Sequence, residues 1–212
     1  MTETMNVHKA LSEVKILNNR IIGKISECQF CIANKVTNKT IKGKSIDEWK
    51  NSVQDNWTSI TTLINRRNAL KQAISKSNAS TEVTIAGKVY TVAEAIEMKQ
   101  YGMDYYNALL NELRNDFSEA NKSVEKTNTD ADIKATDYAQ NCVGSDKSNT
   151  ESLREIEKIR TAYYDSHKAE LIDPIDITKK IGELEEQISS FTSEVDSVLS
   201  VSNATTLITI EY

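Results

Sequence analysis

The most constraining feature of this sequence is a run of apolar residues at alternating steps of four and three near its C-terminal end. The positions that follow this spacing are Ile177, Ile181, Leu184, Ile188, Phe191, Val195 and Val198. An α-helix brings residues at such a spacing to one side, where they pack against another helix. The segment therefore predicts a long helix that starts at Asp173-Pro174 and belongs to a coiled-coil hairpin or a helical bundle.

A second segment with this spacing lies near the N-terminus. Its apolar positions are Val7, Leu11, Val14, Ile21, Ile25, Cys28 and Ile32, with Asn18 in the one polar slot. A polar residue in such a stripe either sets the register of the helices or lies at the solvent boundary. Cys28 and Cys31 fall inside this predicted helix, so buried structural cysteines are expected there rather than a zinc or redox site.

Two capping boxes mark the starts of two more long helices. In each box a hydroxyl residue is followed three positions later by a glutamate, which satisfies free N–H groups at a helix start. The boxes are Ser45 with Glu48, before a helix predicted over 46–76, and Thr91 with Glu94, before one predicted over 92–124.

The stretch between these two helices predicts a β-hairpin. Residues 81–85 and 89–92 are rich in β-branched side chains, and Gly87 supplies the turn between them. The C-terminal residues 205–210 have the same character and predict a further strand.

Two polar stretches interrupt the helical pattern, at residues 34–45 and 125–150. We expect a loop over 34–45 with room for a short strand, and an irregular connection over 125–150 with one weak helix over 133–142. A further helix is expected over 151–171. Glycine (6) and proline (1) are rare, which favours long helices elsewhere. The predicted fold is mainly α: a single elongated domain over residues 1–212, an antiparallel helical bundle of coiled-coil hairpins with a small β-hairpin plus a C-terminal strand.

One twelve-residue stretch occurs twice. Residues 74–85 (ISKSNASTEVTI) and 199–210 (LSVSNATTLITI) are identical at seven of twelve positions. Each predicts a helix end followed by a strand, with Asn78 and Asn203 as left-handed helix terminators. We expect the two strands to lie side by side in one sheet. The repetition reflects either shared helix-end chemistry or a ligand site lined by the two asparagines.

The order of these parts resembles a family of small bacterial and phage proteins called septicolysin-like. The resemblance rests on residues 63–70 leading into 77–81, on residues 90–96, and on the segment 176–206, a little under half of the chain. The polar insertions at 34–45 and 125–150 depart from the family pattern. The resemblance implies a helical bundle with a small hairpin that forms oligomers. No membrane-active segment supports the cytolysin label.

Charge and composition exclude several classes of partner. The chain has 26 basic and 31 acidic residues, interspersed, with a net charge of −5, which predicts no nucleic-acid partner. No apolar run approaches the roughly 18 residues of a membrane span, so no membrane partner is expected. Because the N-terminus lacks signal-peptide features and three cysteines form no disulfide framework, we expect a cytoplasmic protein of a bacterium or an infected host cell.

No catalytic, metal or cofactor motif is visible in the sequence. The patterns GxSxG, HExxH, GxGxxG and the P-loop are missing, and His8 and His167 belong to no motif. We therefore predict a protein that is not an enzyme and needs no cofactor.

Basic, aromatic and amide side chains supply the candidate ligand-binding residues. Guanidinium groups bind phosphate bidentately, and aromatic rings offer stacking surfaces. The candidates are Arg66, Arg67, Lys71, Asn78, Tyr90, Tyr105, Arg154, Arg160 and Asn203. The alternative is that they form salt bridges and core contacts.

The sequence thus predicts a homo-oligomeric binding protein that sequesters a small, phosphate-bearing, nucleotide-like signal. A phage protein of this kind would withhold an immune signal from its host. The alternative function is a structural or assembly protein, such as a scaffold or virion component, built from coiled coils.

Overall fold

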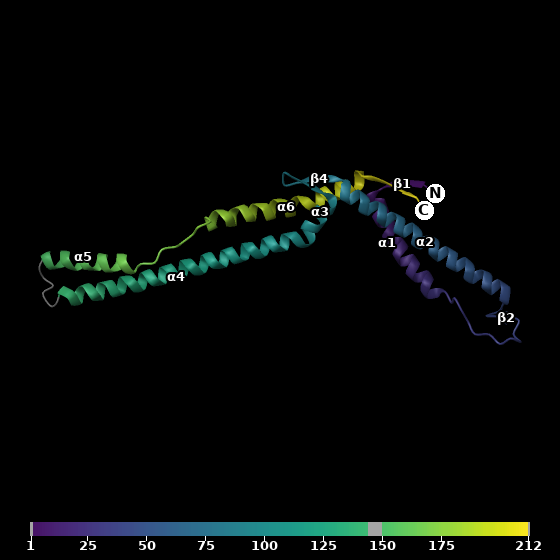
Figure 1. Ribbon diagram of the computed structural model, residues 1–212, viewed down its shortest axis with the longest axis horizontal. Coiled ribbons are helices and arrows are strands. Elements are labelled where there is room, and N and C mark those ends of the chain that lie inside the picture. The colour runs from purple at the N-terminus through teal and green to yellow at the C-terminus, as the bar shows by residue number, and fades with distance from the viewer. Residues whose placement is uncertain (1, 144–149, 212) are drawn as a thin grey trace. The chain divides into compact units, whose positions relative to one another are not determined.

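The computed structural model describes residues 2–143 and 150–211 (Figure 1). The described chain is mainly α-helical with three short antiparallel strand pairs, which confirms the predicted fold class. The helices are α1 (Val7–Glu27), α2 (Ile46–Ser80), α3 (Val92–Glu97), the π-helical turn η1 (Met98–Gly102), α4 (Met103–Val143), α5 (Thr150–His167) and α6 (Ile177–Thr205). The strands are β1 (Thr2–Asn6), β2 (Thr40–Ile41), β3 (Lys44–Ser45), β4 (Glu82–Ile85), β5 (Lys88–Thr91) and β6 (Leu207–Glu211).

The chain divides into two compact units, where the sequence pattern predicts one domain. Unit 1 comprises Met1–Tyr101 and Ser190–Tyr212, and unit 2 comprises Gly102–Ser189. Helix α6 contributes residues to both units.

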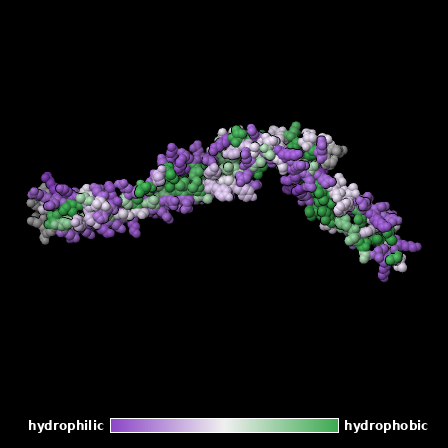
Figure 2. Space-filling model, in the orientation of Figure 1, coloured by the Kyte–Doolittle hydropathy of each residue, from purple (hydrophilic) through white to green (hydrophobic). Residues whose placement is uncertain are grey.

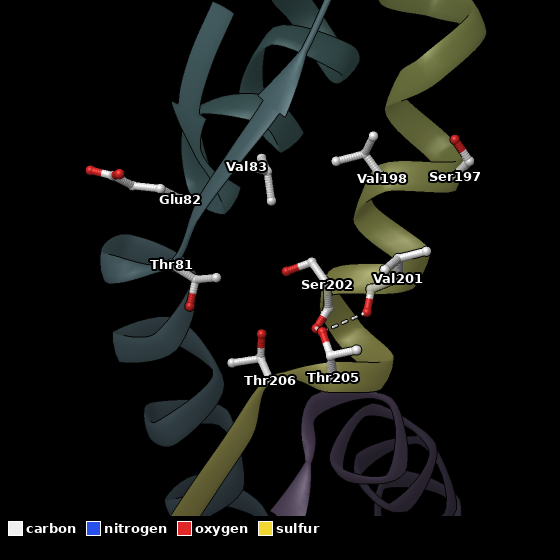
Figure 3. A pocket seen from close by; sticks show the side chains of 9 residues that line it. All are labelled: Thr81, Glu82, Val83, Ser197, Val198, Val201, Ser202, Thr205 and Thr206. Atoms are coloured by element: carbon white, nitrogen blue, oxygen red, sulfur yellow. Dashed lines mark hydrogen bonds between the residues drawn. The ribbon is translucent and has the colours of Figure 1, made fainter.

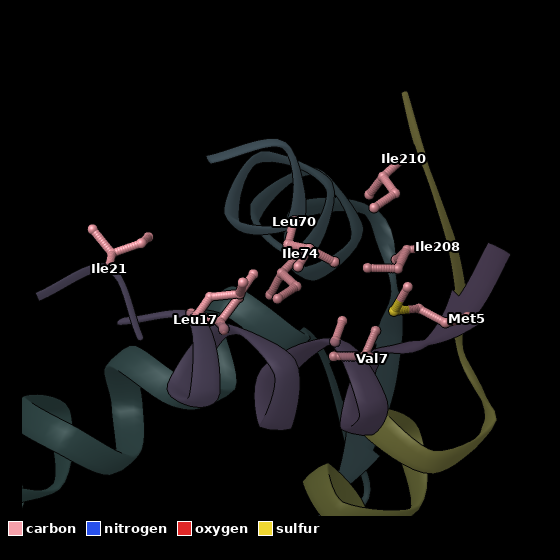
Figure 4. Close-up of a cluster of buried hydrophobic side chains, with 10 residues drawn as sticks. Met5, Val7, Leu17, Ile21, Leu70, Ile74, Ile208 and Ile210 are labelled. Carbon is pink, nitrogen blue, oxygen red and sulfur yellow. The ribbon is translucent and has the colours of Figure 1, made fainter. Parts of the chain in front are cut away.

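The core of unit 1 joins α1 and α2 to the strands β1 and β6 (Figure 4). Its residues are Met5, Val7, Ala10, Val14, Leu17, Ile21, Leu70, Ile74, Ile208 and Ile210. The buried stripe of α1 therefore includes Ala10 and Leu17, whereas the predicted Leu11 and Ile25 are exposed. Two apolar stripes lie next to each other on α1, and only contact with α2 decides which one is buried.

Helix α1 ends at Glu27, earlier than predicted. Cys28, Cys31 and Ile32 therefore follow the helix instead of lying in its stripe. Cys28 is half-buried and Cys31 is exposed, so the prediction of buried structural cysteines was wrong.

The strands form three separate two-stranded ribbons: β1 with β6, β2 with β3, and β4 with β5. The β4–β5 hairpin is confirmed, and its turn places Ala86 and Gly87 at positive φ. The short β2–β3 ribbon lies in the stretch 34–45, where a loop with room for a short strand was expected. The prediction of one sheet containing both β4 and β6 was wrong, because the N-terminal residues form β1 and pair with β6.

The two helices that precede β4 and β6 end alike, but not at asparagine. Asn78 and Asn203 lie inside the last turns of α2 and α6, so their prediction as helix terminators was wrong. The backbone N–H of Thr81 donates to the carbonyl of Ser77 (2.8 Å), and that of Thr206 donates to Ser202 (2.9 Å). After Thr81 the chain continues in extended conformation, which requires no left-handed residue.

The same junction between ribbon and helices occurs twice in unit 1. The N–H of Val92, the first residue of α3, donates to the carbonyl of Thr81 (2.9 Å), and the N–H of Val7, the first residue of α1, donates to Thr206 (3.0 Å). In the ribbons, Glu82 pairs with Thr91 and Leu207 pairs with Asn6, and the register then continues identically. The fold is thus a tandem β-α-α-β repeat. The first repeat is β1-α1-α2-β4, and the second runs from β5 through α3 and α4 to α6 and β6, with α5 inserted.

Unit 2 contains the longest helix, α4, with α5 packed against it. Residues 125–143 continue α4, so the prediction of an irregular connection was wrong for 125–132, and the helix predicted over 133–142 is the end of α4. Residues 144–149 lie outside the described chain. Ala131, Ala135 and Ala139 are buried at intervals of four, which lets the two helices approach closely. A stripe of small residues is invisible to a search for large apolar side chains.

The ends of α5 and α6 also differ from the prediction. Helix α5 ends at His167, and α6 begins at Ile177 rather than at Asp173-Pro174. The Asp173 carboxylate accepts hydrogen bonds from the N–H groups of Ile175 (3.2 Å) and Ile177 (2.8 Å). Asp173 therefore provides a hydrogen-bond acceptor for the first N–H group of α6, although it lies four residues before the helix.

Candidate functional site

The nine predicted ligand-binding residues are divided between the two units. Unit 1 contains Arg66, Arg67, Lys71, Asn78, Tyr90 and Asn203, and unit 2 contains Tyr105, Arg154 and Arg160. Lys71, Tyr105 and Arg154 are exposed, Tyr90 packs edge-on against Phe191 at a centroid distance of 5.8 Å, and the remainder are half-buried.

Arg66 is enclosed by carboxylates. Its guanidinium donates from Nε to Glu13 and from Nη2 to Glu3 (2.8 Å), and only 18% of the side chain is exposed. The hydrogen bond to Glu13 is the main cause that raises the pKa of Arg66 above its ordinary value. Because two carboxylates already compensate this cation, a phosphate group would have to displace them.

Arg160 has a similar environment in unit 2. Its Nη2 donates to Asp132 on α4 (2.6 Å), and its Nη1 donates to Glu157 one turn earlier on α5 (3.2 Å). The hydrogen bond to Asp132 is the main cause that raises the pKa of Arg160. This arginine therefore links α4 to α5, as the salt-bridge alternative expected.

A groove of about 360 Å³ lies between the two copies of the repeated stretch (Figure 3). It is lined by Thr81, Glu82, Val83, Ser197, Val198, Val201, Ser202, Thr205 and Thr206. Asn78 and Asn203 are not among the lining residues, and Glu82 is the one charged residue that is. The hydroxyls of Ser197 and Thr205 donate to carbonyl groups of their own helix. With a carboxylate and no cation, this groove is unsuited to phosphate.

A second groove, of about 370 Å³, lies on the surface where α1 packs against α2. It is lined by Asn18, Ile21, Ile22, Ile64, Arg67 and Asn68. The Arg67 guanidinium donates to the amide oxygens of Asn18 (3.0 Å) and Asn68 (3.1 Å). Asn18, the polar residue of the predicted stripe, is thus exposed at the edge of the helix contact and holds Arg67 in place.

Large apolar side chains are exposed along α1, on the segment after it and on α2, and Ile22 and Ile64 among them line the second groove. They are Leu11 (39% exposed), Ile22 (68%), Ile25 (43%), Phe30 (39%) and Trp57 (57%), with half-buried Ile64 among them. Phe30 and Trp57 meet edge-to-face at 6.3 Å. Figure 2 shows hydrophobic side chains gathered along α1 and α2. We call this set of six residues the α1–α2 face.

The α1–α2 face is large for a surface that remains in water. With about 150–250 Å² of area per large side chain, the exposed fractions leave roughly 500 Å² of apolar surface. That lies in the upper part of the range for the largest patch on a typical monomer, and such patches are often functional.

The second repeat lacks the equivalent of this face on its last helix. The matched ends of α2 and α6 place Gly182 and Ser189 at the positions of Trp57 and Ile64, and Glu185 at the position of the buried Ile60. Glu185 forms an ion pair with Arg114 (2.5 Å). The last helix of the second repeat therefore has no large apolar side chain where α2 contributes to the α1–α2 face.

The sequence pattern placed part of this face in the core. Leu11 and Ile25 belonged to the predicted buried stripe of the first helix, whereas Ile22 and Phe30 were not in that stripe. A signal was present, because α1 has more large apolar residues than one helix contact can bury, Ile16 and Ile22 being further exposed examples.

Two absences concern the described residues only. Within 2–143 and 150–211, no group of three or more histidine, cysteine, aspartate or glutamate side chains is arranged to hold a metal ion. In the same ranges, no helix combines the length and the hydrophobicity that crossing a membrane demands.

No protein-family model, curated protein or solved structure significantly matches the chain. The resemblance to the septicolysin-like family therefore stays a prediction.

Proposed function

We propose that this chain is a structural or assembly protein that associates with further copies of itself through the α1–α2 face. One observation carries the proposal. Five large apolar side chains are exposed on α1, on the segment after it and on α2, and the positions on α6 that match Trp57 and Ile64 of this face are Gly182 and Ser189.

Burial of this face favours association. Two copies that bury their faces together remove roughly 1,000 Å² of apolar surface from water, which is favourable. Association costs about 4–15 kcal/mol in lost translational and rotational freedom, so the quality of the packing decides the affinity together with the area.

Sedimentation equilibrium over a wide concentration range tests the proposal. We expect the wild-type protein to form oligomers and Trp57→Ser to shift the equilibrium towards the monomer. Val89→Ser is the matched control, because Val89 is also an exposed apolar residue but lies on β5, outside the face. A wild-type protein that stays monomeric at every concentration would contradict the proposal.

A second candidate function is binding of a phosphate-bearing, nucleotide-like ligand in the groove beside Arg67. The observation that favours it is local: Arg67 is held by two neutral amides, so no carboxylate compensates its charge in those contacts. Calorimetry with cyclic nucleotides and ADP-ribose derivatives tests this hypothesis, with Arg67→Ala as the comparison. Binding heat that Arg67→Ala abolishes supports it, and the lack of heat with every compound counts against it.

A further inference from the structure

We propose that the occupant of the α1–α2 face is one second copy of the chain, docked so that the two α2 helices run antiparallel. The inference rests on the proposed function for the surface itself. It adds the number of copies, which is two, and their orientation.

The orientation follows from the order of residues along α2. Trp57, Ile64 and Lys71 are spaced by seven, and Arg67 lies between the last two, so all four share one side of the helix. Trp57 lies towards the start of α2 and is exposed, whereas Arg67 and exposed Lys71 lie towards its end. The face is therefore apolar and aromatic at one end and cationic at the other.

A parallel arrangement would bring like charges together. Arg67 and Lys71 of one copy would lie beside Arg67 and Lys71 of the other, and the groove around Arg67 contains no carboxylate. Four cations near one another, partly removed from water, repel strongly. The parallel orientation is disfavoured for this reason.

An antiparallel arrangement places the cationic end of each α2 over the aromatic end of the other. Arg67 and Lys71 then approach the exposed ring of Trp57, and guanidinium and ammonium groups are attracted to the face of an indole. The residues around Ile22 and Ile64, in the middle of the face, contact the same residues of the second copy across a two-fold axis. Apolar contacts lie at the centre and cation–aromatic contacts lie on both sides.

The two-fold axis also limits the assembly to two copies. In an isologous contact each copy uses the same surface, so the pair closes and leaves no second face free. The two copies of α1 and α2 together form four helices around one apolar interior, which a single hairpin cannot enclose.

Distances between spin labels on the two copies test the orientation. The three cysteines, Cys28, Cys31 and Cys142, are replaced by serine, and one nitroxide label is attached at Lys50→Cys. Lys50 is exposed and lies fourteen residues from Ile64. At 1.5 Å per residue, an antiparallel pair separates the two labels by about 40 Å along the helices, whereas a parallel pair brings them within about 20 Å.

A label at Asn68→Cys is the matched control. Asn68 is exposed and close to the axis, so its labels lie within about 20 Å of each other in either orientation. A long distance at position 50 with a short one at 68 supports the proposal. Short distances at both positions overturn the antiparallel orientation while leaving self-association intact. Labelled protein that forms no pairs, and sediments as a monomer, overturns both the inference and the proposed function.

Discussion

The two ribbon junctions of unit 1 have the same backbone and different side chains. Ribbons β1–β6 and β4–β5 share their register and their hydrogen bonds to the helices. On α2, however, the position four residues before Leu70 is Arg66, bound to Glu3 and Glu13. The equivalent position on α6 is Phe191, which is buried against the ring of Tyr90. The same backbone pattern is thus compatible with two sets of side chains: the ion pairs of Arg66 in one junction, and the aromatic pair of Tyr90 and Phe191 in the other.

The last helices of the two repeats, α2 and α6, also differ on their outer surfaces, and there the first repeat is the more apolar one. The first repeat, which has the ion pairs of Arg66, carries the apolar α1–α2 face, whereas α6 of the second repeat carries Gly182 and Ser189 at the positions of Trp57 and Ile64. The same junction is therefore compatible with different outer surfaces on the helices that it joins.

The largest expected effect concerns the core position that the two junctions share. Leu70 on α2 and Val195 on α6 are both fully buried. We expect Leu70→Ala to lower the free energy of unfolding by about 2–5 kcal/mol, and Val195→Ala by less because fewer carbon atoms are removed. Urea unfolding followed by tryptophan fluorescence reports on unit 1, which contains both tryptophans, Trp49 and Trp57. Equal stability of Leu70→Ala and wild type would show that Leu70 does not contribute to the packing of the core.

The next effect compares how much the two sets of side chains contribute to the free energy of unfolding. Arg66→Ala leaves Glu3 and Glu13 partly buried without their cation, and we expect a loss of about 1–3 kcal/mol, reduced from the fully buried case by solvent. The combination Met5→Tyr, Glu13→Met and Arg66→Phe copies the second junction into the first. It should recover most of the loss in urea unfolding. A triple variant less stable than Arg66→Ala would show that the two sets of side chains are not interchangeable.

A smaller effect distinguishes the two helix starts. Asn6 caps α1 and Thr91 caps α3, and replacing either by alanine should cost about 1 kcal/mol. The hydrogen bond from the Thr91 N–H to Glu94 lowers the pKa of that carboxyl below 4.5, its ordinary value. The Glu94 contribution is therefore present above about pH 4.5 and is lost as the pH falls through the lower, folded pKa.

Amide exchange at the first turns of α1 and α3 measures this difference. Protection at α3 should fall in acid and should lose that pH dependence in Glu94→Gln. The equivalent residue of α1 is Lys9, so α1 should show no such acid step. The same acid step at both helix starts would disprove the assignment to Glu94.

The smallest effect concerns the turn between β4 and β5, which has no counterpart in the β1–β6 ribbon. Ala86 has a φ of 50°, in the left-handed region that costs alanine roughly 1 kcal/mol, and Gly87 follows it. Ala86→Asn creates the Asn-Gly pair preferred in such hairpins and should raise the free energy of unfolding by about 0.5 kcal/mol. Thermal unfolding detects the gain. A lower melting temperature would indicate that asparagine disturbs the bond from the Ala86 N–H to Glu194 (2.7 Å).

Much of the local structure was predictable because its signals are local. Both capping boxes form as predicted, the β4–β5 hairpin turns at Gly87, and the predicted stripe of α6 is buried or half-buried from Ile177 to Val198. The pairing of β1 with β6 was not predictable, because it joins opposite ends of the chain and Thr2–Asn6 has little strand character. The continuation of α4 was missed because its contacts use alanine.

The candidate site was harder to predict than the fold. Whether an arginine can bind a phosphate depends on its tertiary neighbours. Glu3 on β1 and Glu13 on α1 meet Arg66 only when these elements pack beside α2. The α1–α2 face was hidden for a related reason. Leu11 and Ile22 lie on one side of α1 and Leu17 on another, and only packing shows which side α2 covers.

The most direct test of the account measures association and folding in one sample. Ile22→Ser with Ile25→Ser removes two exposed side chains of the α1–α2 face and touches neither ribbon junction. Sedimentation velocity should show that the wild-type protein pairs and the double variant is monomeric, while far-UV circular dichroism shows the same helical content in both. A wild-type monomer, or a double variant that loses helix together with association, would contradict the separation of fold from association.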